Sequence, residues 1–246
     1  MNKNVIAIIP ARGGSKRIPR KNIRQFMGKP VISYPITAAI QSGCFGEVMV
    51  STDDTEIAEV AKSFGAVVPF MRSEKTANDY ASTADVLLEV LEEYKKLNKY
   101  FNYCCCIYPV TPLINTEILN NAMTKIIETK ADSLMPVIRY SHPIQRALQI
   151  DFNDRLSYVY PENAMMRTQD LPSRFHDAGQ FYFLNVDTFL KNKTLVSKNT
   201  TAIQMSENCV QDIDTEDDWQ IAELKYQFSN LSQLTFCQNR RGGGSG

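Results

Sequence analysis

The chain has 246 residues, with 27 Lys and Arg against 27 Asp and Glu, so its net charge is near zero. This length fits one α/β domain with room for an inserted segment. A balanced charge argues against a general nucleic-acid-binding protein, which would carry a broad basic surplus. No apolar run in the sequence approaches the roughly 20 residues that span a membrane. We therefore expect neither nucleic acid nor a membrane as a partner.

Apolar strands alternate with amphipathic helices over most of the chain. Strands are expected at 5–9, 47–52, 66–70, 103–108, 133–138, 179–184 and 202–204. Helices are expected at 30–42, 53–64, 84–91, 115–126, 186–191 and from 215 to about 226. Repeated alternation of this kind predicts an α/β fold with a mainly parallel sheet and helices on both of its faces.

The alternation fails between Arg139 and Asn185. Short segments there contain many aromatic residues and both histidines of the chain, His142 and His176. We interpret this stretch as an inserted, mainly β lobe. The predicted domains are an α/β unit over 1–138 and 186–230, the lobe over 139–185, and a flexible Gly-rich tail over 231–246.

The cysteines and the first residues indicate a reducing compartment. The six cysteines include no C-x-x-C pair, which argues against a zinc site. Residues 104–106 are three consecutive cysteines in an apolar run, as expected for small buried residues of a strand. No signal-peptide pattern precedes the first expected strand. We therefore expect a reduced, cytoplasmic protein.

The loop after the first strand carries a dense positive charge. The apolar run Val5–Ile9 stops at Pro10, and Gly13 and Gly14 follow. Between Arg12 and Arg24 there is no acid, and the cations are Arg12, Lys16, Arg17, Arg20, Lys21 and Arg24. Glycines let backbone N–H groups approach a ligand, and the surrounding cations suit a polyphosphate. The alternative is a solvated basic loop with a Gly-Gly turn.

Two common nucleotide motifs are absent from the sequence. Neither G-x-x-x-x-G-K-[ST] nor G-x-G-x-x-G occurs, which argues against a P-loop NTPase and a typical dinucleotide dehydrogenase. The ordered string from Ile8 to Asn22 instead resembles the amino-terminal signature of the CMP-sugar-acid synthetases, also called acylneuraminate cytidylyltransferases. The resemblance implies a Rossmann-like nucleotidyltransferase that moves CMP from CTP to a 2-keto sugar acid, with Mg²⁺ as cofactor. It also implies a homodimer formed through the inserted lobe.

The resemblance assigns a nucleotide site residue by residue. Its members are Arg12, Gly13, Ser15, Lys16, Lys21, Asn22, Arg72, Ala81 and Ser82. Cations in the loop would bind the phosphates and stabilise the leaving pyrophosphate, with Lys21 as the main catalytic cation and Arg12 beside it. For Ser82 an alternative is a helix capping box with Asp85, three residues later.

Asp212 and Asp214 are the acidic counterpart of the loop. Carboxylates at i and i+2 of an extended segment point to the same face. Mg²⁺ commonly takes one or two carboxylates together with substrate phosphates. The family's metal-binding Asp-x-Asp falls at this position, which implies that both residues bind Mg²⁺ and act in catalysis. The alternative for Asp214 is a helix N-cap with Asp217 three residues later.

The sugar site is predicted from strings that differ from the sialic acid branch of the family. Tyr108 stands where that branch has Gln, and Gln145 stands where it has Lys. The string 176–182 resembles that of the pseudaminic acid cytidylyltransferases. The predicted sugar-binding residues are Tyr108, Gln145, Arg146, Arg167, His176, Gln180 and Tyr182. The alternative is that these residues pack the β lobe.

These observations predict a Mg²⁺-dependent cytidylyltransferase that joins CMP to a nine-carbon 2-keto sugar acid, pseudaminic acid, and releases pyrophosphate. One alternative is a CMP-N-acetylneuraminate or CMP-legionaminate synthetase. Another is a non-catalytic nucleotide-binding domain on the same fold, because a fold does not fix a function.

Overall fold

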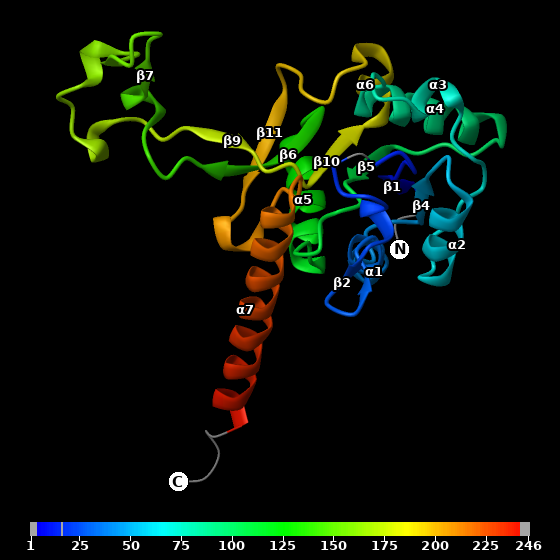
Figure 1. The fold of residues 1–246 in the computed structure, drawn as a ribbon. Helices are drawn as coiled ribbons and strands as arrows, with labels where there is room; N and C mark the ends of the chain where they lie inside the picture. Colours follow the sequence, from blue (N-terminus) through cyan, green and yellow to red (C-terminus); the bar gives the residue numbers. More distant parts are fainter. Residues whose placement is uncertain (1–3, 16, 242–246) are drawn as a thin grey trace.

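The computed structural model of the chain describes residues 4–15 and 17–241, with side chains to Ser229. A seven-stranded sheet lies at its centre (Figure 1). In chain order its strands are β1 (Val5–Pro10), β4 (Glu47–Ser51), β5 (Tyr103–Ile107), β6 (Ser133–Arg139), β9 (Phe175–Asp177), β10 (Phe181–Asn185) and β11 (Thr200–Gln204).

The sheet is mixed, with a parallel majority. Its main path has the order β11-β6-β10-β5-β1-β4, and β9 pairs with β6 off this path. β1 runs parallel to β4 and β5, and β11 runs parallel to β6. β10 is antiparallel to both of its neighbours, β5 and β6, and β9 is antiparallel to β6. The predicted α/β fold with a mainly parallel sheet is therefore confirmed.

Helices cover both faces of the sheet, as predicted. They are α1 (Ser33–Ser42), α2 (Thr55–Ser63), α3 (Glu74–Ala77), α4 (Thr83–Lys96), α5 (Thr116–Thr129), α6 (Val186–Asn192) and α7 (Glu216–Arg241). Short 3-10 turns are η1 (Lys21–Ile23), η2 (Ile144–Arg146), η3 (Pro161–Asn163), η4 (Thr168–Asp170) and η5 (Glu207–Cys209). None of the helices in the described ranges is long and apolar enough to cross a membrane.

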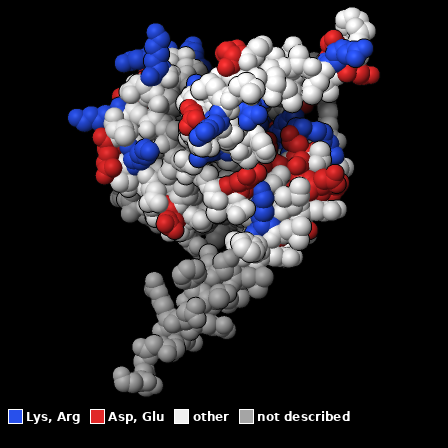
Figure 2. Space-filling view, turned by 90° about the vertical axis from the view of Figure 1, so that its left-hand side faces the viewer, with Lys and Arg blue, Asp and Glu red and all other residues white. Residues whose placement is uncertain are grey.

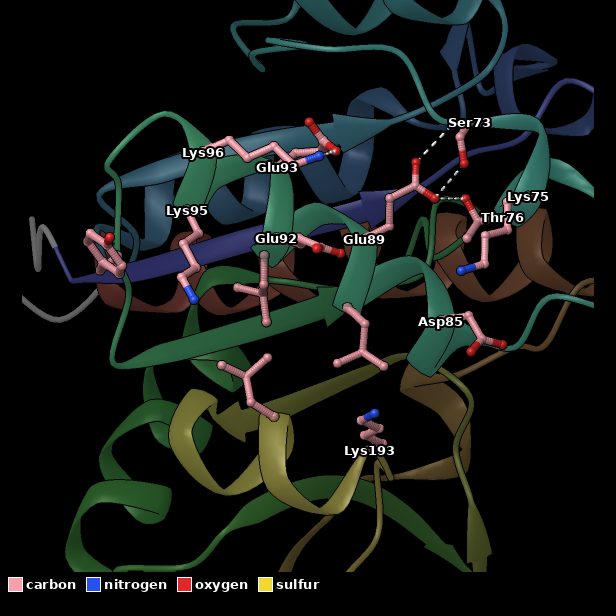
Figure 3. Close-up of a pocket in the computed structure, with 14 residues that line it drawn as sticks. Ser73, Lys75, Thr76, Asp85, Glu89, Glu92, Glu93, Lys95, Lys96 and Lys193 are labelled. Carbon is pink, nitrogen blue, oxygen red and sulfur yellow. Dashed lines mark hydrogen bonds and ion pairs between the residues drawn. The ribbon is translucent and has the colours of Figure 1, made fainter.

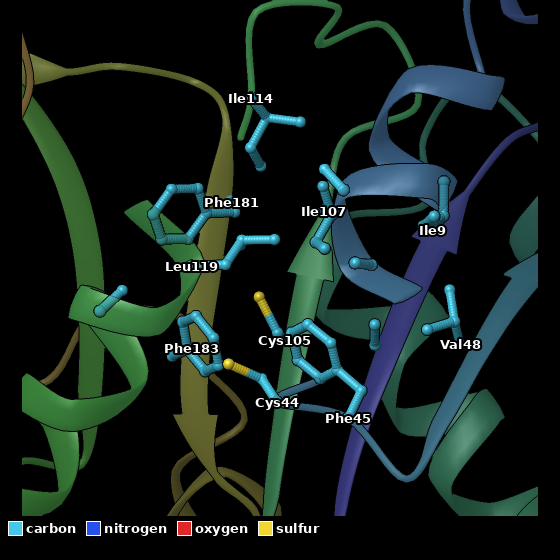
Figure 4. Packing of buried hydrophobic residues seen from close by; sticks show 14 of the residues in the cluster. Ile9, Cys44, Phe45, Val48, Cys105, Ile107, Ile114, Leu119, Phe181 and Phe183 are labelled. Atoms are coloured by element: carbon cyan, nitrogen blue, oxygen red, sulfur yellow. The ribbon is translucent and has the colours of Figure 1, made fainter. Parts of the chain in front are cut away.

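Alternate residues of the central strands feed two separate cores. In β1, Val5, Ala7 and Ile9 pack toward α1 and α5, whereas Ile6 and Ile8 pack toward α4 and α6. Figure 4 shows the first of these cores, where Phe181 and Phe183 of β10 face Cys105 and Leu119. Because the strands are covered on both faces, they read as continuous apolar runs instead of alternating ones.

The cysteine triplet lies in the middle of this sheet. Cys104 and Cys106 belong to one core and Cys105 to the other, and all three are fully buried. Burial raises the pKa of the Cys104 thiol to about 12. The prediction of small buried strand residues is confirmed, and these thiols are poor nucleophiles at neutral pH.

A third core fixes the loop after β1 to the start of α7. The hairpin β2 (Gln25–Phe26) and β3 (Lys29–Pro30) places Phe26 against Trp219, with ring centroids 5.6 Å apart. Tyr34 and Tyr226 close the same aromatic cluster, edge to face. Burying such aromatic side chains contributes about 1.5–3 kcal/mol each. The cluster therefore brings the basic loop and the acidic segment before α7 together.

Two parts of the chain project from this body (Figure 1). One is an arm at 140–174, which contains the hairpin of β7 (Leu148–Ile150) and β8 (Leu156–Tyr158). The other is α7, whose 26 residues make a rod about 39 Å long. The arm lies within the predicted lobe at 139–185, but that lobe also included β10. β10 is buried on both faces and belongs to the main sheet, so the projecting part is shorter than predicted.

Some sequence boundaries were wrong. The expected strand at 66–70 is reduced to an isolated bridge between Met49 and Val67. The last helix continues to Arg241 instead of ending near Tyr226, so the predicted tail at 231–246 is helical over its first eleven residues, 231–241. The remaining residues, 242–246, lie outside the described chain.

Candidate active site

The candidate site lies at the edge of the sheet where the parallel strands end. The loop at 11–20 follows β1, Asp53 follows β4, and Tyr108 follows β5. The turn at 178–180 meets the same edge, because β10 is antiparallel and begins there, and the Tyr108 N–H donates to the Gln180 carbonyl at 2.9 Å. Ligands of open α/β sheets bind outside the carboxyl ends of the strands.

Gly13 packs closely against its neighbours at this edge. A Cβ atom at residue 13 would lie 2.7 Å from Asp54 Oδ2 and 3.0 Å from Asp54 Cβ, so a larger residue would require the Asp54 side chain to shift. Its N–H donates to Asp53 Oδ1 at 2.9 Å. At Gly14, by contrast, a Cβ would meet nothing within 4 Å. The close approach predicted for Gly13 is therefore to the Asp53–Asp54 segment, and its approach to a nucleotide stays a prediction.

Hydrogen bonds within the loop fix its course. The buried Asn22 donates from Nδ2 to the Arg12 carbonyl at 2.8 Å, and the Ser15 N–H donates to the Gly13 carbonyl at 3.0 Å. The Arg12 guanidinium forms an ion pair with Asp79. Lys16, which was also predicted to bind the nucleotide, lies outside the described residues. Asn22 therefore shapes the loop, whatever else it contacts.

Lys21 joins the basic loop to the acidic segment. Its Nζ donates to the Ile213 carbonyl at 2.5 Å and lies 3.4 Å from Asp214 Oδ1, across 193 residues of sequence. Arg17 forms a second ion pair with Asp214, at 2.7 Å. The structure thus brings together Lys21 and Asp214, which the sequence predicted as one catalytic group from opposite ends of the chain.

Asp214 does not cap α7. The N-cap role belongs to Thr215, whose Oγ1 accepts from the Asp218 N–H at 3.2 Å. Asp218 Oδ2 in turn accepts from the Thr215 N–H at 2.8 Å and from the Asp214 N–H at 3.1 Å. The capping alternative for Asp214 is therefore wrong, and its carboxylate faces Lys21 and Arg17.

The Asp212 carboxylate has no described hydrogen-bond donor, and its pKa is raised. None of the described side chains or N–H groups donates a hydrogen bond to its carboxylate. Although the residue is exposed, its carboxyl group lies beside Gly179, where an added Cβ would be 3.9 Å from Oδ2. Partial burial first, and then repulsion from Asp214, raise the pKa of Asp212. A divalent cation would relieve both effects.

The remaining cations of the loop have structural partners. Arg20 pairs with Asp54 and Glu56, and its hydrogen bond is the main cause that lowers the pKa of Asp54. Arg24 pairs with Glu216 at 2.5 Å and lies 4.4 Å from the ring centroid of Trp219. Both arginines therefore hold the loop to α2 and α7, a task that the sequence did not indicate.

Three predicted nucleotide residues hold local structure. The buried Arg72 donates from Nε to Ser51 Oγ at 3.0 Å and from a terminal nitrogen to the Ser51 carbonyl at 2.7 Å. Burial lowers the pKa of this guanidinium. Ser82 and Asp85 form the reciprocal capping box of α4, and Ala81 donates its N–H to Asn78 Oδ1 at 3.0 Å. The capping alternative for Ser82 is thus confirmed, while nucleotide contacts of all three stay predictions.

The predicted sugar residues divide into two groups. Tyr108 and Tyr182 lie together at the sheet edge with ring centroids 5.7 Å apart. Gln180 is 1% exposed and donates its side-chain amide to the Ala178 carbonyl at 3.1 Å. Its sugar contact stays a prediction, because this side chain has almost no accessible surface.

The second group lies on or next to the arm. Gln145 donates from Nε2 to the Pro172 carbonyl at 2.8 Å, while its Oε1 and Arg146 Nε are buried without a described partner. Arg167 is exposed in the arm, and His176 is exposed at its base, stacked obliquely on Tyr140 with ring centroids 4.9 Å apart. The arm, which contains Gln145, Arg146 and Arg167, projects from the body of the molecule (Figure 1).

A separate hollow of about 890 Å³ lies between α4 and α6. Five of its lining residues already pair with one another: Glu89 accepts from Ser73 and Thr76, and Lys96 pairs with Glu93 at 2.6 Å (Figure 3). It contains none of the predicted site residues. We place the candidate site at the sheet edge, where the Lys21 contacts lie together with Asp212, whose carboxylate has no donor among the described residues.

The chain matches known proteins along nearly its whole length. The profile of the cytidylyltransferase family matches residues 6–241. The chain belongs to the cytidylyltransferase family. It is therefore an enzyme of that family, and the resemblance noted in the sequence is confirmed.

Individual relatives agree with this membership. A pseudaminic acid cytidylyltransferase of Campylobacter jejuni is 40% identical over 227 residues, which cover 92% of this chain and 98% of that protein. A CMP-N,N'-diacetyllegionaminic acid synthase of Legionella pneumophila is 33% identical, over 89% of this chain and 94% of that protein. The structure of CMP:2-keto-3-deoxy-manno-octonic acid synthetase complexed with CTP matches with a TM-score of 0.68 and 17% identity, covering 93% of this chain and 99% of that chain. At 17% identity, the match to this synthetase structure shows that the two chains share a fold.

Sequence reasoning missed several residues of the site. Asp79 pairs with Arg12, and Asp177 accepts a hydrogen bond from the Tyr182 hydroxyl at 2.5 Å. Thr83 shares a hydrogen bond of 3.1 Å with the Tyr108 hydroxyl. Asp79 lies in a polar stretch without a motif, whereas Thr83 directly follows the predicted nucleotide residues Ala81 and Ser82 but was given no role. Asp177 lies within the string 176–182, which was noted for its resemblance to pseudaminic acid cytidylyltransferases. No role was predicted for the Asp177 carboxylate.

Proposed function

We propose that this cytidylyltransferase transfers CMP from CTP to the anomeric hydroxyl of a nine-carbon 2-keto sugar acid, pseudaminic acid, and releases pyrophosphate. The observation that carries the proposal is the junction of Lys21 with the Asp212–Asp214 segment. On one sheet edge, beside a Gly-Gly loop, lie an ammonium group and a carboxylate that accepts no hydrogen bond from the described residues. Such a combination suits phosphoryl chemistry, where catalysis consists mainly of positioning and charge stabilisation.

Lys21 would stabilise the charge that develops on the leaving pyrophosphate. Its Nζ is already oriented by the Ile213 carbonyl and Asp214, so little reorganisation is needed when CTP binds. Arg12, at the start of the loop, would contact the phosphates after exchanging its pairing with Asp79. The sugar hydroxyl attacks the α-phosphate in line, and the bond to the β-phosphate breaks.

The donor set fits Mg²⁺. Asp212 offers a carboxylate without a described donor, and Asp214 offers a second one, which now neutralises Lys21 and Arg17. No group of three or more metal-binding side chains occurs among the described residues, so substrate phosphates would supply the remaining ligands. Held by Asp212 and Asp214, a Mg²⁺ ion would supply positive charge that offsets the charge of the phosphates.

The choice of pseudaminic acid has two supports. The first is the 40% identity with a pseudaminic acid cytidylyltransferase over 98% of that relative. The second is the composition of the sugar side, where Tyr108 replaces the Gln of the sialic acid branch and its hydroxyl is already bound by Thr83. A less polar wall suits a sugar with a terminal methyl group. The 33% identical relative makes legionaminic acid the second candidate.

We also propose that the enzyme acts as a homodimer through the arm. The arm exposes large apolar side chains, including Ile150, Phe152 and Met165, with Phe152 96% exposed. Figure 2, which views the molecule from the side of the arm, shows charged groups of both signs scattered between uncharged areas. Exposed apolar patches of this kind mark interfaces. In a dimer, a second copy would cover these apolar side chains. Arg146 and Arg167 of one copy would then lie at the sugar site of the other copy.

The free cysteines fit a reducing compartment, which supports a cytoplasmic location. No described cysteine is in a disulfide, and Cys209 is exposed as a free thiol.

Pyrophosphate release tests the reaction class. Purified enzyme with Mg²⁺ and pseudaminic acid should release pyrophosphate with CTP and at least about tenfold less with UTP, ATP or GTP. Equal release with another nucleotide would contradict the assignment of CTP. No release with any nucleotide and any nine-carbon sugar acid would favour the non-catalytic alternative.

A further inference from the structure

Asp177 lies between the arm and the sheet edge, with both carboxylate oxygens bound. It is the last residue of β9, the strand that returns from the arm. Its Oδ1 accepts from the Gly179 N–H at 2.8 Å, and its Oδ2 accepts from the Tyr182 hydroxyl at 2.5 Å. One side chain thus fixes both the turn after the arm and the aromatic residue behind it.

The turn that Asp177 closes is next to the acidic segment. Gly179 has φ +61°, a backbone conformation that other residues adopt only with strain. A Cβ at this position would also come 3.9 Å from the Asp212 carboxylate. The Asp177–Gly179 hydrogen bond therefore holds a turn that lies directly beside the Asp212 carboxylate.

The aromatic residue that Asp177 binds continues toward the nucleotide side. Tyr182 is 5% exposed and packs edge to face on Tyr108, with an interplanar angle of 73°. The Tyr108 hydroxyl then shares a hydrogen bond with Thr83, the first residue of α4. Burial first raises the pKa of both phenols, so that they remain neutral across the physiological range.

We propose that Asp177 is a positioning residue for the sugar acid, acting through Tyr182 on Tyr108 and through Gly179 on the turn beside Asp212. The inference rests on the proposed function, because it assumes that Tyr108 faces the sugar. Both phenol hydroxyls are held by protein groups, so the partly exposed Tyr108, backed by the buried Tyr182, would offer the sugar its ring surface. Asp177 therefore sets how the acceptor lies and which acceptors fit, while CTP binds through the loop at 11–22.

The test compares Asp177→Ala and Tyr182→Phe with a matched control, Tyr94→Phe. Tyr94, on α4, is also buried, and its hydroxyl also donates to a carboxylate, that of Glu47. The described ring contacts and hydrogen bonds of this pair are with Phe70, Phe101 and Lys99, none of which is a predicted site residue. A hydrogen bond to a charged group contributes about 1.5–3 kcal/mol, so the expected changes are about tenfold or more.

Asp177→Ala is expected to raise the KM for the sugar acid about tenfold and to change the KM for CTP by less than about threefold. The preference for pseudaminic over N-acetylneuraminic acid should fall as well. Tyr182→Phe should produce a smaller change of the same kind, and the double variant should add little to Asp177→Ala, since both act through one bond. Tyr94→Phe should lower the melting temperature without moving either KM.

Three outcomes would overturn the proposal. One is an equal rise in the KM for CTP and for the sugar. Another is an unchanged sugar KM and selectivity in a folded Asp177→Ala enzyme. The third is the same selectivity loss in Tyr94→Phe, which would reveal a general effect of core stability. Failure of the proposed function is distinguishable from all three, because then the unmodified enzyme would form no CMP–sugar. Should Asp177→Ala fail to fold, Asp177→Asn keeps one acceptor oxygen and carries the same test.

Discussion

The sheet edge at Lys21 and the arm at 140–174 differ in how their side chains are held. At the edge, Lys21 and Arg17 both contact Asp214, across most of the sequence, and a buried aromatic cluster joins the same two segments. In the arm, apolar side chains are exposed and two polar atoms, Gln145 Oε1 and Arg146 Nε, are buried without a described partner. The comparison teaches that contacts within one chain hold the side chains of the proposed nucleotide site in place, whereas the arm leaves apolar and polar groups without described partners.

Removal of the Lys21 ammonium group should have the largest effect. Lys21→Ala is expected to lower kcat by about 10²–10³, the usual result of losing one preorganised charge contact in a transition state. CTP binding should weaken much less. Steady-state kinetics with varied CTP measure both quantities, and Lys29→Ala, an exposed lysine of the β2–β3 hairpin, is the control. Near-normal turnover of Lys21→Ala would contradict the proposal that the Lys21 ammonium group stabilises the transition state.

Asp212→Asn should have the next largest effect. We expect activity at fixed Mg²⁺ to fall by about 10–100-fold and the Mg²⁺ concentration for half-maximal activity to rise, by analogy with the effect of disturbing metal-ligand shells. Asp217→Asn removes the same charge from an exposed position of α7 and should leave the Mg²⁺ titration unchanged. An unchanged titration in Asp212→Asn would return this residue to a structural role.

The metal prediction also has a readout without turnover. Thermal unfolding with and without Mg²⁺ should show a rise in melting temperature for the unmodified chain in the presence of CTP, since a ligand that binds only the folded state stabilises it. The rise should be smaller for Asp212→Asn. Equal rises in both proteins would contradict a metal role for Asp212.

The arm offers a third test of the comparison. Phe152→Asp should weaken dimer formation by about thirtyfold, because loss of an apolar interface anchor costs about 2 kcal/mol or more. Analytical ultracentrifugation over a concentration series measures the shift. Leu97→Asp, an exposed apolar residue at the end of α4, is the matched control and should leave association unchanged. Monomeric unmodified enzyme with full activity at micromolar concentration would remove the need for a second copy.

Thiol labelling gives the smallest expected effect and tests the rigidity of the sheet. At pH 8, iodoacetamide should modify Cys209 first, and Cys104, Cys105 and Cys106 only on unfolding, because burial raises their pKa and shields them. Labelling of Cys209 alone should leave activity unchanged. Peptide mass spectrometry follows each site, and early labelling of the triplet would show that the sheet opens more readily than its packing indicates.

Much of the fold could be predicted from the sequence because its signals are local. Continuous apolar strands such as Val5–Ile9 and caps such as Asn115, which accepts from the Ile118 N–H at 3.0 Å, are visible in short windows. The reversed direction of β10 was not visible, because a strand buried on both faces reads the same in either direction. The continuation of α7 beyond Tyr226 was also missed, since its polar composition has no clear stop signal before the glycines.

The site was predicted less evenly than the fold. The pairing of Lys21 with Asp214 followed from a family resemblance, since no local rule joins residues 193 positions apart. The capping of α7 by Thr215 instead of Asp214 depends on a one-residue shift that the sequence leaves open. The roles of Arg24 and Asp177 depend entirely on tertiary neighbours, Trp219 for one and Tyr182 for the other.

The most direct test of the account is a competition between sugar acids. Enzyme, Mg²⁺ and limiting CTP are mixed with equal concentrations of pseudaminic, legionaminic and N-acetylneuraminic acids, and the CMP–sugars are separated by mass. A site with buried polar groups matched to one acceptor can reject others strongly. We expect CMP–pseudaminic acid as the main early product, in at least about tenfold excess. Preferential formation of CMP–legionaminic or CMP–N-acetylneuraminic acid would contradict the sugar assignment, and the absence of every CMP–sugar would contradict the reaction itself.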